Sequence, residues 1–408
     1  MEVNILSIVL SGKLKKRKKF AGLPFLILFL ILMSDIAGFA QIQTPDTSYQ
    51  RAGVKAKLPV FAEHQAKRLS YPFSWLSGKW VNFNEWRSEA RKIVFRCLLS
   101  KPPVAPFNPA VIAEEDRGTY IARKVVFNLT ADSRVLSYLL VPKGKGPFPA
   151  VLLLHDHGAR FDIGKEKVIE PFGCYSALRD TARMWVNQLY GGRFIGDELA
   201  RRGYVCFATD ALNWGDRGGG GYEDQQALAS NLFNLGMSYA GIVAWEDMQS
   251  AEFLASLPFV DSDRISAVGF SFGAFRAWQI SALSDRIACG VAVCWMGTNH
   301  GLLQSGNNRT RGQSAFSTTH PDLSNYLDFP DVASIACPKP MLFMNGTKDK
   351  LFPVETVLEA YDKMCFVWQS QGMTDRLQTE LWDVGHVFTV DMQERVLKWL
   401  DKYLMISY

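Results

Sequence analysis

The sequence predicts an α/β fold in which helices flank a mostly parallel central sheet, with a helical extension at the N-terminus. Two observations carry this prediction. From about residue 118 onward, short continuous apolar runs alternate with longer segments that have helical spacing. Continuous apolar runs are typical of strands buried on both faces of a parallel sheet, because crossover helices cover both sides.

The individual elements follow from this alternation. Apolar runs that predict strands occupy residues 119–129, 134–142, 148–157, 203–210, 264–270, 287–295, 339–345 and 377–386. Helical spacing marks residues 194–202, 241–257, 273–283, 354–371 and 391–404. Two stretches, 159–192 and 211–240, are longer than simple connections need, and such segments at strand ends commonly form lids and substrate pockets.

Residues 1–40 have the features of a signal peptide. Six basic residues precede an apolar run of 13, and the small residues Gly38 and Ala40 precede Gln41. The apolar run is short for a bilayer span, which needs about 20 residues. We therefore expect cleavage and export to the periplasm or the extracellular space, without stable membrane insertion, rather than a retained anchor.

The rest of the chain divides into two regions. Residues 41–117 are expected to form a linker and a helical N-terminal extension, because 84–99 has helical spacing and prolines 102, 103 and 106 follow it. Residues 118–408 are expected to form the domain that contains the sheet.

Charge and cysteine content argue against two classes of function. The formal net charge is +5, but outside residues 1–40 there are 39 basic and 38 acidic side chains, which gives no reason to expect a nucleic-acid partner. The seven cysteines lack the CxxC or Cys/His spacing of zinc sites. We expect neither a bound metal nor an essential disulfide framework.

The segment Gly269-Phe270-Ser271-Phe272-Gly273 lies between a predicted buried strand and a predicted helix. A side chain at either glycine would clash as the chain doubles back, so the two glycines predict a tight, strained turn. Such a turn exposes the Ser271 hydroxyl above the first turn of the helix, where the helix dipole favours negative charge. Ser271 is therefore the candidate nucleophile.

A serine nucleophile needs a base, and the base needs an acid to orient it. His386 follows the last predicted strand, and Asp349 follows the strand before it. The chain order Ser271, Asp349, His386 is the order in which this motif occurs on parallel sheets. Asp383 competes for the acid position, but we expect it to cap or pair locally. We expect Asp210 to stabilise a loop.

Two backbone N–H groups are candidates for stabilising an oxyanion. The first belongs to Phe272, at the start of the helix. The second belongs to Ala159, which follows Gly158 after the predicted strand 148–157. His155, Asp156 and His157 are close enough to suggest a metal site, but their side chains would point in differing directions and no remote ligand is marked. We expect His157 to brace the loop.

Five ordered motifs carry a resemblance to a known family. They are LLLHDHG, GYVCFATDALNWGDR, VGFSFGAFRAW, NGTKDKLFP and DVGH. In these motifs, the chain from about 118 to 405 resembles the α/β-hydrolases, and among them the secreted bacterial branch of acetyl xylan esterases and dienelactone-hydrolase-like proteins. The helix predicted at 84–99 resembles the Trp/Arg helix that precedes the hydrolase domain in that branch. One departure is Ala274, which stands where many relatives have glycine.

The resemblance implies that residues 118–408 form a catalytic domain that transfers acyl groups to water without a cofactor. Ser271 would attack an ester carbonyl, His386 would act as base and then as acid, and Asp349 would hold its imidazole. The N–H groups of Phe272 and Ala159 would form the oxyanion hole.

The leading hypothesis is an exported serine esterase that removes acetyl or similar acyl groups from plant polysaccharides or oligosaccharides. His157, Arg160, Trp214 and Arg217 are candidate substrate-binding residues, whereas Trp295 is expected to be a core residue. One alternative is a serine peptidase of the prolyl-oligopeptidase type, which usually carries a large β-propeller that this chain has little room for. The other is a catalytically silent carbohydrate-binding homologue.

Overall fold

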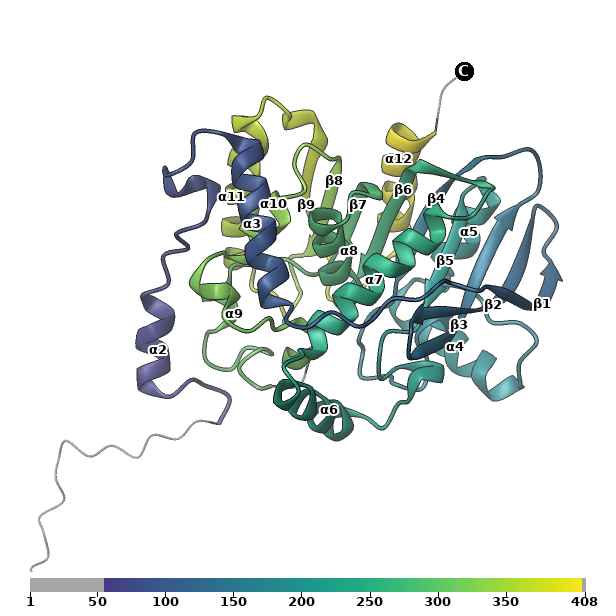
Figure 1. The fold of residues 1–408 in the computed structure, drawn as a ribbon, viewed down its shortest axis with the longest axis horizontal. Helices are drawn as coiled ribbons and strands as arrows, with labels where there is room; N and C mark the ends of the chain where they lie inside the picture. Colours follow the sequence, from purple (N-terminus) through teal and green to yellow (C-terminus); the bar gives the residue numbers. More distant parts are fainter. Residues whose placement is uncertain (1–54, 313, 406–408) are drawn as a thin grey trace, which may run out of the picture. The chain divides into compact units, whose positions relative to one another are not determined.

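A nine-stranded sheet forms the centre of the protein (Figure 1). The computed structural model describes residues 55–312 and 314–405, so the predicted signal peptide lies outside the described residues. The strands are β1 (Ala110–Asp116), β2 (Tyr120–Thr130), β3 (Ser133–Pro142), β4 (Phe148–Leu154), β5 (Val205–Thr209), β6 (Val260–Phe270), β7 (Ile287–Val293), β8 (Met341–Gly346) and β9 (Leu377–Trp382).

The strand order is β1-β2-β3-β5-β4-β6-β7-β8-β9. The first three pairings in this order are antiparallel, and the remaining five are parallel. The prediction of a mostly parallel sheet is therefore confirmed. The carboxyl ends of β4, β6, β7, β8 and β9 meet at one edge, which is where such sheets form their sites.

Helices cover both faces of the sheet (Figure 1). They are α2 (Val60–Lys67), α3 (Phe83–Cys97), α4 (Ser176–Leu189), α5 (Ile195–Arg201), α6 (Tyr222–Asn234), α7 (Tyr239–Ala255), α8 (Phe272–Leu283), α9 (Asn299–Leu302), α10 (Phe329–Ser334), α11 (Val354–Ser370) and α12 (Val390–Leu404). Helices α3, α7, α8, α10 and α11 share one hydrophobic core, and α4, α5 and α12 share the other.

Strand β4 shows why continuous apolar runs predict this arrangement. Ala150 and Leu152 belong to the core under α7 and α8, whereas Val151 and Leu153 belong to the core under α5 and α12. Alternate side chains of a strand point to opposite faces, so a strand covered on both faces must be apolar at every position.

Helix α3 packs its apolar face on the core beside the sheet, as its spacing predicted. Trp86, Ala90 and Val94 are fully buried, and they lie on one side of the helix. Asn82 caps the start of the helix, because its side-chain oxygen accepts hydrogen bonds from the N–H groups of Asn84 and Glu85.

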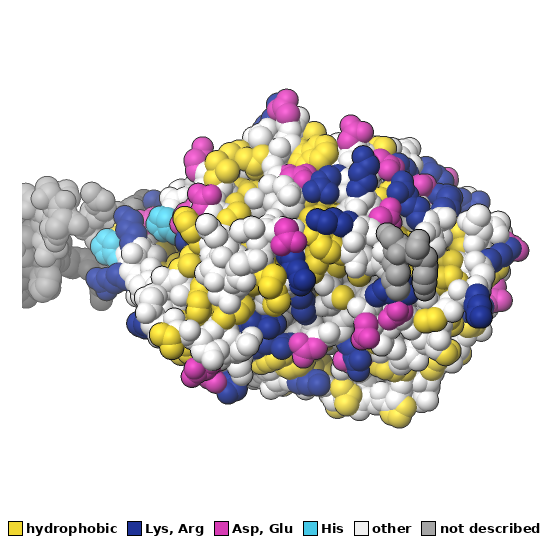
Figure 2. Space-filling view, turned by 90° about the horizontal axis from the view of Figure 1, so that it is seen from above, with side chains coloured by type: hydrophobic (Ala, Val, Ile, Leu, Met, Phe, Trp, Pro, Cys, Tyr) yellow, Lys and Arg dark blue, Asp and Glu magenta, His cyan; other side chains and the backbone are white. Residues whose placement is uncertain are grey.

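Several elements escaped the sequence analysis. Strand β1 is exposed at almost every position and pairs only with β2, and its apolar residues are confined to 110–113. Helices α4 and α6 lie inside the long segments 159–192 and 211–240. Figure 2 shows Lys and Arg side chains interspersed with Asp and Glu over one face, in line with the balanced charge. Within the described residues, every helix is too short or too polar to cross a bilayer.

Candidate functional site

Ser271 occupies a strained turn between β6 and α8. Its φ of 55° and ψ of −121° are unfavourable for a non-glycine residue, and its N–H is held by the carbonyl oxygen of Val293 at 2.7 Å. A Cβ atom on Gly269 would lie 2.0 Å from the carbonyl oxygen of Gly273, and one on Gly273 would lie 1.9 Å from that of Leu154. Both glycines are therefore required by close backbone contacts, and the turn lifts the Ser271 side chain off the end of the sheet.

His386 and Asp349 reach Ser271 from the loops after β9 and β8. The Nε2 atom of His386 lies 2.8 Å from Oγ of Ser271, and its Nδ1 atom lies 2.6 Å from Oδ2 of Asp349. An ionised carboxylate only accepts hydrogen bonds, so Nδ1 carries the proton and Nε2 accepts from the serine hydroxyl. The structure thus brings the three predicted side chains into one continuous hydrogen-bonded sequence.

The imidazole of His386 is flanked by two phenyl rings. Its centroid lies 5.0 Å from that of Phe270 and 6.1 Å from that of Phe352, the latter at an interplanar angle of 16°. The side chain of Asp349 is fully buried, whereas that of His386 is 21% exposed. These rings and this burial exclude most water, which strengthens the hydrogen bonds between the polar groups.

Cys294 is the neighbour that sequence reasoning missed. Its Sγ atom and ligand atoms of Asp349 and His386 all lie within 4.8 Å of one another, so the three could bind a metal ion. Burial raises the pKa of the Cys294 thiol, and its Sγ donates to the carbonyl oxygen of Val387. A protonated thiol is a weak metal ligand, and Asp349 and His386 already bond to each other. The position of Cys294 at the end of a strand was the available signal, but its apolar context indicated core packing.

The two competing aspartates bind elsewhere. Asp383 is 80% exposed and pairs with Lys348 at 2.9 Å. Asp210 is buried and accepts hydrogen bonds from the backbone N–H of Lys165 at 2.7 Å and from its Nζ at 2.8 Å. Neither carboxylate contacts His386, in agreement with the local roles expected for them.

The two candidate oxyanion donors differ in the structure. The N–H of Phe272 begins helix α8, and among the described residues we find no acceptor for it. The N–H of Ala159 donates to Nδ1 of His157 at 3.1 Å. His157 is itself buried, its Nε2 lies 3.3 Å from Oε1 of Gln225, and burial lowers its pKa to about 4. His157 is therefore a neutral brace for the loop, and Phe272 offers the available donor.

The remaining candidate substrate residues have structural partners. Arg160 pairs with Asp162 at 3.0 Å. Arg217 binds both carboxylate oxygens of Glu246, at 2.6 and 2.7 Å. Trp214 is fully buried, where it stacks on Phe161 and Phe272. These placements do not favour the substrate contacts that we expected of Arg160, Arg217 and Trp214, because two of the side chains are neutralised and the third is in the core.

A buried charged segment supports the loop that contains Ala159. Lys165, Glu166 and Lys167 form a short 3-10 helix, and all three are buried. The Nζ atom of Lys167 donates to the carbonyl oxygens of Asp156 and His157 at 2.9 and 3.0 Å. Sequence reasoning missed this cluster because consecutive charged residues are normally exposed.

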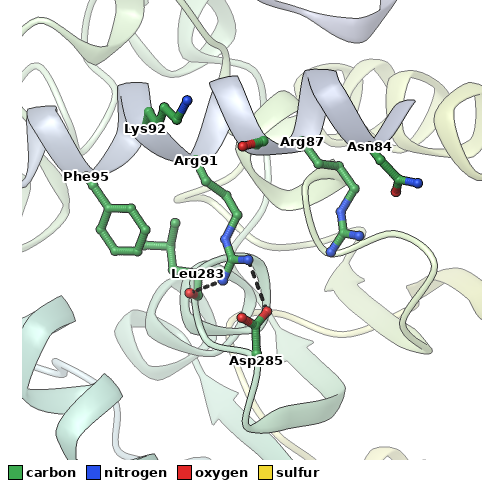
Figure 3. Close-up of a pocket in the computed structure, with 8 residues that line it drawn as sticks. Asn84, Arg87, Arg91, Lys92, Phe95, Leu283 and Asp285 are labelled. Carbon is green, nitrogen blue, oxygen red and sulfur yellow. Dashed lines mark hydrogen bonds and ion pairs between the residues drawn. The ribbon is translucent and has the colours of Figure 1, made fainter. Parts of the chain in front are cut away.

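A large hollow lies far from these groups, between α3 and the end of α8 (Figure 3). Its volume is about 640 Å³. The Arg91 guanidinium reaches across it to Asp285 at 3.0 Å and to the carbonyl oxygen of Leu283, and Arg87 donates to the carbonyl oxygen of Ile335. These arginines anchor α3 to the domain, so the hollow carries no catalytic constellation.

Comparisons with known proteins bear on the family and the fold of the chain. Residues 64–365 match the model of the Abhydrolase family. The chain is 28% identical to the Bacillus subtilis (strain 168) protein named "Putative hydrolase YtaP" over 319 residues, which cover 78% of this chain and 100% of that protein.

Two solved structures share the fold. One is named "putative acetyl xylan esterase" and comes from Bacteroides fragilis; it has a TM-score of 0.63 and 18% identity and covers 79% of this chain and 81% of its own. The other is a glucuronoyl esterase from Solibacter usitatus, with a TM-score of 0.57 and 15% identity, covering 88% and 98%. Because the family match spans well over half of the sequence, this chain belongs to the Abhydrolase family and has the α/β-hydrolase fold.

Proposed function

We propose that this protein is an exported serine carboxylic-ester hydrolase that removes acetyl or similar acyl groups from plant polysaccharides or oligosaccharides. The observation that carries the proposal is the hydrogen-bonded sequence from Ser271 through His386 to Asp349, at 2.8 and 2.6 Å. Heavy-atom distances of this length are those over which a base can take a proton.

The proposed reaction has two halves. Oγ of Ser271 attacks the ester carbonyl while Nε2 of His386 takes its proton, and the resulting oxyanion accepts a hydrogen bond from the Phe272 N–H. The tetrahedral intermediate then expels the sugar alcohol, which receives the proton from His386. Water, deprotonated by His386, attacks the acyl-serine, and the carboxylic acid leaves as Ser271 regains its proton.

Asp349 acts through the imidazole. Its buried carboxylate fixes the Nδ1–H tautomer and stabilises the imidazolium that forms when Ser271 is deprotonated. Its Oδ1 accepts the N–H of Leu351 at 2.9 Å, which holds the carboxylate in place. The Phe272 N–H, at the start of a helix, is worth roughly 3–4 kcal/mol of barrier by analogy with single oxyanion-hole donors.

The substrate class rests on two supporting arguments. The two fold neighbours are named as a putative acetyl xylan esterase and a glucuronoyl esterase. The predicted signal peptide, residues 1–40, supports export, where polymeric substrates are encountered. We propose that the reaction needs no cofactor, because the three side chains and the backbone donor supply the whole acid–base sequence.

The test is acetate release from a panel of acetylated plant polysaccharides by the wild type and by Ser271→Ala. We expect a loss of at least about 10⁴-fold in kcat for Ser271→Ala, because removal of the nucleophile leaves only binding and oxyanion stabilisation. Ser230→Ala is the matched control, since Ser230 is exposed on helix α6 and should leave the rate unchanged.

Two outcomes would contradict the proposal. Cleavage of aminoacyl anilides without cleavage of acetate esters would indicate a peptidase. A folded protein whose Ser271 does not react with an organophosphonate probe would indicate a binding protein.

A further inference from the structure

The hollow between α3 and the end of α8 carries more positive than negative charge (Figure 3). The charged side chains that line it are those of Arg87, Arg91, Lys92 and Asp285. Its volume of about 640 Å³ lies within the range of small-ligand sites, roughly 300–1,000 Å³. Because α8 has 12 residues and a helix rises about 1.5 Å per residue, roughly 18 Å separate this hollow from the turn that contains Ser271. A ligand bound in the hollow would therefore be remote from the proposed catalytic residues.

Arg87 lines the hollow with most of its donors unused. Its Nε donates to the carbonyl oxygen of Ile335 at 2.9 Å. Among the described residues, neither of its Nη atoms has an acceptor and no carboxylate forms an ion pair with it. A guanidinium has five N–H donors, so most of them remain available for a ligand. Figure 3 shows the Arg87 guanidinium projecting from α3 to the same side as that of Arg91.

Arg91 supplies a second guanidinium at this place. Its Nη1 pairs with Asp285 at 3.0 Å and its Nη2 donates to the carbonyl oxygen of Leu283, whereas its buried Nε has no hydrogen-bond partner within the described part of the chain. The side chain of Asp285 is 82% exposed, so water and salt screen much of its charge. The two guanidinium groups are therefore only partly neutralised.

Positive charges crowd at this end of α8. Burial lowers the pKa of Arg87, and the neighbouring charge of Arg91 adds to the shift. The Nζ atom of Lys339 donates to the carbonyl oxygens of Ser281 and Ser284 at 2.8 and 2.7 Å, and burial lowers its pKa to about 7. An anion bound here would offset the repulsion between these cations and accept hydrogen bonds from the Nη groups of Arg87.

Half-buried arginines elsewhere in the domain pair with carboxylates. Arg193 pairs with Glu394 and Arg264 with Asp261, both at 2.7 Å, and the side chains of these arginines are 22% and 20% exposed. A charge that is partly removed from water without a carboxylate beside it favours binding of an anion from solution.

We propose that this hollow binds a phosphate or sulfate group, held by the Nη groups of Arg87 and by the Arg91 guanidinium. Such a group carries up to two negative charges and has oxygen atoms directed to several sides, so it can accept from both guanidinium groups at once. The bound group ties α3 to the end of α8, and its binding is independent of the chemistry at Ser271.

The experiment is calorimetric titration of the full chain with inorganic sulfate, inorganic phosphate and glycerol 3-phosphate at constant ionic strength. We expect saturable binding at one site. Arg87→Gln should weaken this binding by at least about tenfold, the effect of one lost charge-assisted hydrogen bond. Binding of the inorganic ions supports a site for a free anion, and binding of glycerol 3-phosphate alone supports a site for a phosphate ester. The absence of saturable binding of all three overturns the proposal.

Arg96→Gln is the matched control. Arg96 lies about two and a half turns after Arg87, which places it on the opposite face of α3, and its side chain is 54% exposed. The charge change is identical, so binding in Arg96→Gln should equal that of the wild type. Equal losses of affinity in the two variants would indicate a non-specific effect of net charge and overturn the site.

A second variant tests the sign of the electrostatic argument. Asp285→Asn removes the carboxylate that lines the hollow, and we expect it to strengthen binding by up to about fivefold, the effect of one exposed charge. A purely structural role of the arginines would produce no such gain, so unchanged or weaker binding would overturn the site. Ser271→Ala should bind the anion as the wild type does, which separates the outcome of this test from that of the esterase proposal.

Discussion

Lys167 provides the sharpest test of how the domain holds the loop beside Ser271. Its fully buried Nζ donates to the carbonyl oxygens of Asp156 and His157 and lies 3.7 Å from Oδ2 of Asp156. Burial lowers the pKa of Lys167, and the Asp156 carboxylate opposes that shift. Lys167→Met keeps the aliphatic stem but removes both hydrogen bonds and the positive charge.

The expected loss of stability follows from the Asp156 carboxylate, which Lys167→Met leaves buried without its compensating charge. Asp156 is completely buried, and its Oδ2 has no hydrogen-bond partner among the described residues, so Lys167 is its nearest compensating charge. Removing one partner of a buried ion pair costs about 3–5 kcal/mol, because the other charge remains uncompensated. Since whole domains are stable by only about 5–15 kcal/mol, we expect Lys167→Met to lower the free energy of unfolding by a large fraction.

The assay is urea unfolding of Lys167→Met, of Asp156→Asn and of the double variant. Asn at 156 retains an oxygen that can accept from Tyr190 and Trp185, as Oδ1 does now at 2.6 and 3.2 Å. The double variant should therefore recover more than half of the stability that Lys167→Met loses. Lys167→Met alone should also have a lower kcat than the wild type.

The control is Lys143→Met. The Lys143 ammonium pairs with Asp116 at 2.7 Å on the surface. Its replacement should therefore lower the free energy of unfolding by less than about 1 kcal/mol. A loss below about 1 kcal/mol in Lys167→Met, or a double variant no more stable than that single variant, would refute the argument.

Two further predictions concern buried groups near the site. Burial lowers the pKa of His320 to about 3. Below pH 6.5 the unfolded chain therefore binds a proton at this residue that the folded chain does not. The free energy of unfolding should fall by about 2 kcal/mol between pH 7.5 and 5.0 because of this residue. In urea unfolding, His320→Gln should lose about 2 kcal/mol less stability than the wild type between pH 7.5 and 5.0. His64→Gln, a change at an exposed position, should lose as much stability as the wild type. An equal loss in His320→Gln and the wild type would exclude the role of His320. Gly273→Ala should lower the free energy of unfolding by about 3 kcal/mol, because its Cβ would overlap a backbone oxygen at 1.9 Å. Its control is Gly385→Ala, whose Cβ meets nothing nearer than 3.9 Å and which should unfold at nearly the wild-type urea concentration. Equal unfolding midpoints for the two variants would contradict the steric argument.

The sheet was predictable wherever burial alone determined the residue type. Strands β4, β7 and β8 and residues 265–270 of β6 are buried and mostly apolar because helices cover both of their faces. Strand β1 was missed because it lies at the sheet edge, where no such pressure acts. The meeting of Ser271, Asp349 and His386 followed from chain order, since each lies at the carboxyl end of a strand in one parallel sheet.

The buried ion network could not be predicted in the same way. The Nζ atom of Lys165 lies 2.8 Å from Oδ2 of Asp210 and 2.6 Å from Oδ2 of Asp216, residues 45 and 51 positions away, and such distant partners make its burial possible. Local sequence patterns indicate which side chains prefer to be buried, but they do not indicate which charged side chains contact one another in the interior.

Ala159 can serve as the second oxyanion donor expected from the sequence only if its N–H leaves Nδ1 of His157. One neutral hydrogen bond contributes about 0.5–1.5 kcal/mol net, whereas one oxyanion donor contributes roughly 3–4 kcal/mol in the transition state. Moving the Ala159 N–H from His157 to the oxyanion is therefore favourable once negative charge develops on the ester oxygen, but not before. The rotation must be confined to a short segment, because a Cβ on Gly158 would overlap Trp185 at 2.1 Å and Lys167 holds the two preceding carbonyl groups. The ion network thus keeps the loop rigid up to Gly158, and only the peptide that carries the donor is left to turn.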